Sequence, residues 1–129
     1  MYSMLLERIS EIYNSECRYE CKYSSLEDIE FKIMTRELKE LNTCLACLIK
    51  EALISIGVPH MLITSLKGDL HEVFFLEDAL IDVSSEGGFI VKGDEVQEYI
   101  DMLVEFRVYD PKDVDKIRYM INSVTHAKG

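Results

Sequence analysis

The chain has 129 residues, which is typical of one domain with a hydrophobic core of its own, and 48% of them are hydrophobic. Its formal net charge of −10 argues against binding to nucleic-acid backbones, which are held by clusters of Lys and Arg, and it suits solubility or a basic protein partner. Since no apolar run is long enough for a signal peptide or a membrane span, we expect a cytoplasmic protein with no membrane contact, whose four cysteines are reduced thiols.

The first part of the chain has the apolar spacing of helices. A helix is predicted over residues 4–13, and a capping signal at Ser24–Asp28 predicts a second helix that runs to about Leu41. A third helix, Cys44–Ile56, is ended by Gly57. Because apolar residues nearly surround this third helix, we expect it to be the central, buried one.

The middle of the chain changes to the two-residue period of strands. The predicted strands, separated by turn residues, are His60–Ser65, Leu70–Leu76, Ala79–Val83 and Phe89–Lys92. A meander of three or four antiparallel strands is the simplest arrangement of these segments. Helical spacing returns over residues 94–106, and Asp110 and Pro111 open a last helix, since Pro is favourable at a first helical position.

Together these elements predict one α+β domain over residues 1–129, with helices and strands segregated along the chain. Its expected parts are an N-terminal helical segment, a helical pair that includes the central buried helix, the antiparallel meander, and two C-terminal helices. They are expected to occupy residues 1–24, 25–57, 58–93 and 94–124, in that order.

A tight hairpin in the meander is expected to bring two polar side chains to one face of the sheet. Leu76 and Ala79 can close a two-residue turn. In that register His71 faces Ser84, and Asp82 shares their face. His71 and Asp82 are then diagonal neighbours, roughly 7–8 Å apart at the backbone, which long polar side chains can bridge. A slip of one residue would place them on opposite faces.

Three motifs follow one another over residues 44–83: a helix from Cys44 to Gly57-Val-Pro, then His71-Glu-Val-Phe-Phe, then Ile81-Asp-Val. This series resembles the core of papain-like and transglutaminase-like cysteine enzymes. The resemblance implies that Cys44 is the nucleophile, His71 the general base, and Asp82 the carboxylate that orients it. It further implies a small hydrolase or acyltransferase that acts on an amide, ester or thioester through a thiol acyl-enzyme, without a cofactor.

The chemistry of these residue types is coherent. A thiol in the first turn of a helix has its pKa lowered by the positive end of the helix dipole and by a nearby imidazole. A carboxylate that accepts a hydrogen bond from His71 would hold the useful tautomer. The spacing from Cys44 to Gly57 is about two residues shorter than the family pattern, which would put Asn42 at the nucleophile position. A shortened helix with an active Cys44 and a catalytically inactive relative are both compatible with this spacing.

Each of the three residues also has a simpler structural interpretation. Cys44 lies at helical spacing among apolar residues, and a free cysteine behaves as a small buried hydrophobe. His71 can be a polar residue at the start of a strand, and Asp82 can cap a turn. Under this interpretation the three residues support the fold and perform no chemistry.

The cysteines also raise the question of a metal site. Cys17, Cys21, Cys44 and Cys47 have a spacing loosely similar to that of a four-thiolate zinc site. No Gly or Pro turn accompanies either pair, so packing or surface thiols are the default interpretation. We expect neither a metal nor a cofactor.

A rival hypothesis comes from the acidic residues that cluster over residues 7–30 and 94–115. Such runs usually form solvated faces, but they can also steer and hold a basic protein. The tyrosines interleaved with them are Tyr13, Tyr19, Tyr23, Tyr99 and Tyr109. Because tyrosine is enriched at interfaces, this pattern favours a non-enzymatic acidic binding protein, such as an immunity protein or a phage-encoded inhibitor that neutralises a basic protein or enzyme.

Overall fold

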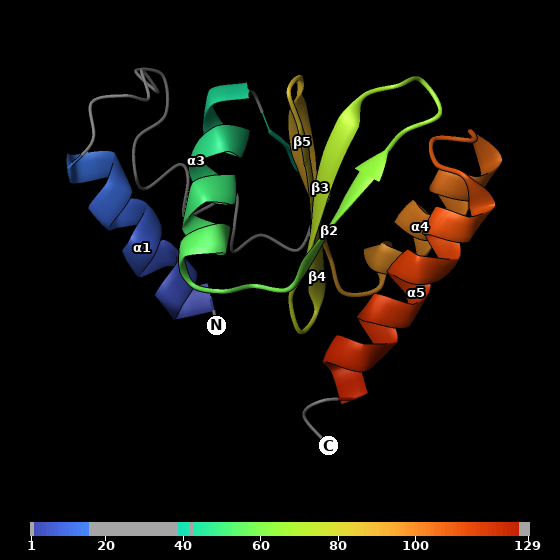
Figure 1. Cartoon of the computed structure of the whole chain (residues 1–129). Helices are drawn as coiled ribbons and strands as arrows, with labels where there is room; N and C mark the ends of the chain where they lie inside the picture. Colours follow the sequence, from blue (N-terminus) through green and yellow to red (C-terminus); the bar gives the residue numbers. More distant parts are fainter. Residues whose placement is uncertain (1, 16–38, 42, 127–129) are drawn as a thin grey trace.

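The structure is a computed structural model that describes residues 2–15, 39–41 and 43–126 (Figure 1). Its helices are α1 (Tyr2–Ser15), α3 (Thr43–Ser55), α4 (Glu95–Glu105) and α5 (Pro111–His126), and its strands are β1 (Lys39–Leu41), β2 (His60–Thr64), β3 (Leu70–Phe75), β4 (Ala79–Ser84) and β5 (Gly87–Lys92). The predicted α+β class is confirmed, with N-terminal helices, an antiparallel meander and two C-terminal helices.

The strands form one antiparallel sheet in the order β1-β5-β4-β3-β2. Strands β2 to β5 are consecutive neighbours, which is the predicted meander, and β1 pairs with the outer edge of β5. The prediction that the second helix runs to about Leu41 is wrong at its end, because residues 39–41 form β1. The rest of that predicted helix lies outside the described residues. Lys, Glu and Leu are good helix formers, but propensity is overridden where tertiary contacts favour another structure, and pairing with the open edge of β5 supplies backbone hydrogen bonds to this segment.

The sheet lies between two helical layers, with α1 and α3 against one face and α4 and α5 against the other (Figure 1). Successive side chains of a strand point to opposite faces, so each strand contributes to both layers. Phe74 and Ile81 pack in the cluster of α1 and α3, whereas Val73, Phe75 and Leu80 pack in the cluster of α4 and α5. The sheet therefore separates two hydrophobic cores.

Helix α3 begins and ends close to the predicted residues. It buries Ala46, Leu48, Ile49, Ala52 and Leu53 against α1 and the sheet. Gly57 follows it with a φ of 79°, the left-handed conformation that glycine adopts without strain. The N–H of Val58 donates to the carbonyl of Leu53 at 3.1 Å, which closes the helix in a Schellman motif. None of the helices in the described part of the chain is long and apolar enough to cross a membrane.

Candidate functional site

The β3–β4 hairpin has the predicted register. The N–H of Leu76 donates to the carbonyl of Ala79 at 3.0 Å across the two-residue turn. His71 pairs with Ser84 of β4. Asp82 lies two residues before Ser84 and therefore on the same face of the sheet. The predicted diagonal contact is confirmed, since Nδ1 of His71 lies 2.7 Å from Oδ1 of Asp82.

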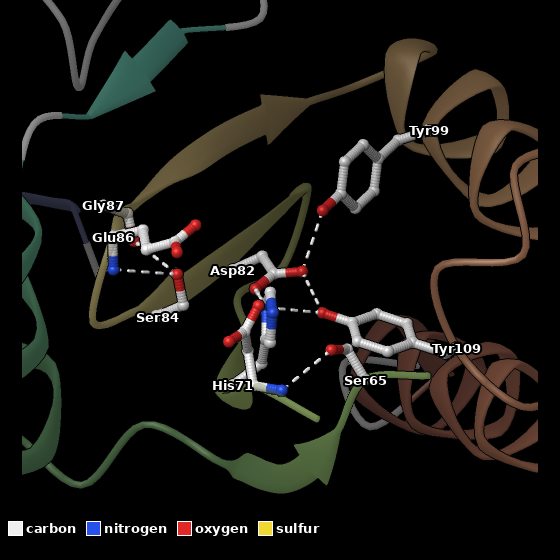
Figure 2. Close-up of polar contacts among 9 residues, drawn as sticks. Ser65, His71, Asp82, Ser84, Glu86, Gly87, Tyr99 and Tyr109 are labelled. Carbon is white, nitrogen blue, oxygen red and sulfur yellow. Dashed lines mark hydrogen bonds and ion pairs between the residues drawn. The ribbon is translucent and has the colours of Figure 1, made fainter. Parts of the chain in front are cut away.

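The carboxylate of Asp82 is buried and is held by side chains from three further segments (Figure 2). His71 of β3 contacts Oδ1. Tyr99 of α4 donates its hydroxyl to Oδ2 at 2.8 Å, and Tyr109, between α4 and α5, donates to the same oxygen. The hydroxyl of Tyr109 also lies 2.9 Å from Nδ1 of His71. These contacts satisfy a buried carboxylate without water, which explains how its charge is tolerated.

Burial and the contact with Asp82 set the protonation of the neighbouring groups. Burial, reinforced by the negative charge of Asp82, raises the pKa of the phenols of Tyr99 and Tyr109, so both remain hydrogen-bond donors. The hydrogen bond to Asp82 raises the pKa of His71, with burial opposing it and the charges of Asp69 and Glu86 adding to it. His71 therefore holds its proton to a higher pH than a free imidazole does.

The network assigns the tautomer of His71. Because a carboxylate can only accept, Nδ1 of His71 carries the hydrogen that points to Asp82. The other ring nitrogen, Nε2, is then the one without a hydrogen in the neutral imidazole, and it has no hydrogen bond to any residue within the described ranges. Such an imidazole can act as a general base or bind a ligand group through Nε2.

His71 and Asp82 line a cavity of about 550 Å³ between the sheet and α4. Tyr99, Met102 and Leu103 of α4 form part of its wall. Apolar side chains from three separate segments line it as well and are open to solvent: Leu66 (57% exposed), Phe89 (36%) and Phe106 (69%). A cavity of this size, largely apolar and with a few converging polar groups, is typical of a binding site.

The expected nucleophile, Cys44, belongs to a helix of the other layer. Cys44 is the second residue of α3, which packs on the face of the sheet opposite to His71 and Asp82. Nothing about its side chain is described, and Cys17 and Cys21 lie outside the described residues. Cys47 is an exposed free thiol. Over the ranges that the structure describes, no group of three His, Cys, Asp or Glu residues is placed to hold a metal ion.

Sequence reasoning missed Tyr99 and Tyr109 as parts of this site. Both were expected as surface anchors of an acidic interface, and this is wrong, because both are buried on the carboxylate of Asp82. A signal for Tyr99 was present, since it lies in the apolar stripe of α4 with Ile100 and Leu103. A tyrosine on a buried stripe needs a partner for its hydroxyl, and the carboxylate of Asp82, which can accept more than the hydrogen bond of His71, was an available acceptor.

No protein-family model matches the chain, and searches of curated proteins and of solved structures returned no similar protein. The resemblance to cysteine enzymes therefore stays a hypothesis that depends on the motifs around Cys44, His71 and Asp82. What can be argued about function comes from the geometry of the site.

Replacing Tyr109 by Phe keeps its packing but removes one donor from the buried carboxylate of Asp82. We expect this to lower the free energy of unfolding by about 1–3 kcal/mol, because the carboxylate loses a hydrogen bond that water cannot replace. Urea denaturation followed by circular dichroism measures the change. Tyr119 is 71% exposed, so Tyr119→Phe is the matched control, with an expected effect below about 0.5 kcal/mol. Equal effects of the two substitutions would contradict the proposed role of Tyr109.

The raised pKa of His71 predicts a dependence of stability on pH. Protonated His71 stabilises the folded state fully below its ordinary pKa of 6.5, and this contribution is lost as the pH rises through the folded-state pKa. The difference in unfolding free energy between the wild type and His71→Gln should therefore shrink above pH 6.5. Denaturation of both proteins at several pH values from 5.5 to about 9 tests this. A difference that grows with pH would refute it.

Proposed function

We propose that this protein is a non-enzymatic, acidic binding protein that holds part of a basic protein partner in the cavity between the sheet and α4. One observation carries the proposal: Leu66, Phe89 and Phe106 are exposed around a cavity in which the polar side chains of His71 and Asp82 are already hydrogen-bonded to each other. Solvent-exposed apolar side chains that gather at a concave site favour an interaction with another molecule. The function needs no metal and no cofactor.

The three apolar side chains come from separate parts of the chain. Leu66 lies between β2 and β3, Phe89 lies in β5, and Phe106 directly follows α4. Neither local helix nor strand formation requires them to meet at one cavity. Covering a large apolar side chain contributes roughly 1.5–3 kcal/mol when burial is complete, so a partner that covers these three gains a substantial part of its affinity there.

Charge supports a basic partner. The chain has a net charge of −10, which attracts cationic proteins at long range and speeds association. Glu98, Asp101 and Glu105 are exposed on α4, spaced so that they share one side of the helix. This acidic row runs along the helix that forms a wall of the cavity. Immunity proteins and inhibitors that neutralise a basic enzyme in the cytoplasm have this combination of small size and negative charge.

Photochemical cross-linking tests the proposal in the cells that produce the chain. A benzophenone amino acid replaces Phe106 at the cavity or Tyr119 on α5, both of which are largely exposed. We expect a cross-linked protein of basic isoelectric point from position 106, in a yield that falls as the ionic strength rises, and little product from position 119. Equal yields at the two positions, or an acidic protein as the product, would contradict the proposal.

A second candidate is acyl transfer by a cysteine enzyme. The contact of 2.7 Å between His71 and Asp82 favours it, since this is the base and orienting carboxylate that such chemistry needs. The thiolate of Cys44 would attack the carbonyl of an amide, ester or thioester, and His71 would pass the thiol proton to the leaving group. The packing of α3 on the opposite face of the sheet argues against this candidate.

The pH dependence of thiol alkylation tests the second candidate. If Cys44 is paired with His71, it should react rapidly at pH 6, and His71→Ala should slow it at least tenfold, because the thiolate would lose its cationic partner. Mass-spectrometric mapping distinguishes Cys44 from the exposed Cys47, which serves as the internal reference. His60→Ala is the control for loss of an imidazole. If Cys44 reacts no faster than Cys47, the enzyme hypothesis is wrong.

A further inference from the structure

Two cationic side chains line the cavity from neighbouring segments of the chain. Lys67 and Arg107 both line it, and the N–H of Leu66 donates to the carbonyl of Val108 at 3.0 Å, which joins the two segments that carry them. Neither cation forms an ion pair with a residue of the described ranges. Two neighbouring unpaired cations in an otherwise acidic protein are suited to a carboxylate.

Arg107 has an unusual backbone conformation. Its φ is 50°, and it follows α4 at the position where helices usually have glycine. The N–H of Val108 donates to the carbonyl of Leu103 at 3.0 Å, so the segment has the hydrogen bonds of a Schellman motif. Arginine is disfavoured in this conformation, whereas glycine is not. An arginine at such a position is consistent with a role for the guanidinium at the cavity.

The opposite charge gathers around His71. Asp69 and Glu86 line the cavity from two different turns, and the charges of both act on the His71 imidazole. Neither carboxylate forms a side-chain hydrogen bond or an ion pair with a described residue. The carboxylate of Asp82, in contrast, contacts His71, Tyr99 and Tyr109. Two carboxylates without such partners, beside an imidazole, are suited to a guanidinium or ammonium group.

A guest with a single charge would be attracted by one group of charges and repelled by the other. A guest with a cation and a carboxylate meets both, and the cavity of about 550 Å³ is large enough for one amino-acid residue. A C-terminal Arg or Lys carries both charges on one residue, with an aliphatic stem that can lie on the apolar wall formed by Met102 and Leu103. A basic partner supplies such a residue readily.

We propose that the cavity binds the C-terminal Arg or Lys of the basic partner, with the terminal carboxylate at Lys67 and Arg107 and the side-chain cation between Asp69 and Glu86. This inference rests on the proposed binding function and names the group that the cavity recognises. It assigns a role to four charged side chains that make no ion pair within the described part of the chain.

Three tripeptides, titrated into the full-length, ¹⁵N-labelled chain and followed by NMR, test the inference. Gly-Gly-Arg has both the C-terminal carboxylate and the guanidinium, its C-terminal amide lacks the carboxylate, and Gly-Gly-citrulline lacks the guanidinium, while all three share the N-terminal ammonium. We expect Gly-Gly-Arg to bind with shifts at the cavity, and each modified peptide to bind at least tenfold more weakly. Equal binding of the three peptides, or no binding of any, would overturn the inference.

Matched variants assign each charge to its partner. Arg107→Gln should reduce the preference for the free carboxylate over the amide, because only Lys67 then remains, whereas Glu86→Gln should reduce the preference for arginine over citrulline. Lys112→Gln, which replaces an exposed lysine away from the cavity, should leave all three affinities unchanged. If the preferences of the Arg107 and Glu86 variants equal those of the wild type, these residues do not bind the carboxylate and the guanidinium of the peptide, and the inference is wrong.

Free arginine separates a chain terminus from a small metabolite. Its ammonium group lies on the carbon next to the carboxylate, where a chain terminus has an amide, so binding tighter than that of Gly-Gly-Arg would overturn the assignment to a chain terminus. Failure of the peptides together with efficient cross-linking of a basic protein at position 106 would refute this inference alone and leave the proposed function intact. Failure of both the peptide titration and the cross-linking experiment would refute this inference and the proposed function together.

Discussion

The buried carboxylate of Asp82 is the constraint on which the pocket face of the molecule depends. Removing an ion from water costs several kcal/mol, and this cost is offset only where donors fully satisfy the charge. The donors to Asp82 come from β3, from α4 and from the segment between α4 and α5. If any of these segments moved away, the carboxylate would lose a donor, so one charge holds three segments in place.

This arrangement explains why the cavity is preorganised. Tyr99 and Tyr109 hold the C-terminal helices against the sheet through polar contacts, beside the apolar contacts of Val73, Phe75 and Leu80. The polar contacts lie next to the cavity, and the apolar ones fill the core beside it. The side chains of His71, Asp82, Tyr99 and Tyr109 are therefore ordered before a guest binds, and binding loses no further entropy by ordering them.

The parts of this site that the sequence could predict are those set by local rules. The register of His71 and Asp82 follows from a two-residue turn and the alternation of side chains, and both can be worked out on paper. The contacts of Tyr99 and Tyr109 with Asp82 could not be predicted in this way, because Tyr99 lies on α4 and Tyr109 between α4 and α5, and the docking of these segments on the sheet depends on the whole core. Strand β1 was missed because three residues carry too little pattern, and its pairing partner β5 lies more than 40 residues further along the chain.

The separation of the two cores by the sheet has an evolutionary consequence. Side chains that pack on α1 and α3 share no contact cluster with those around α4 and α5. Substitutions on distant sites without shared partners act nearly independently on stability. Selection can thus diversify the cavity side, following a changing partner, while the other side retains the stability that keeps the chain folded. A small protein in antagonistic coevolution would benefit from this division, since exposed side chains at the cavity, such as Leu66 and Phe106, could change while the Asp82 network and the core on α1 and α3 are kept.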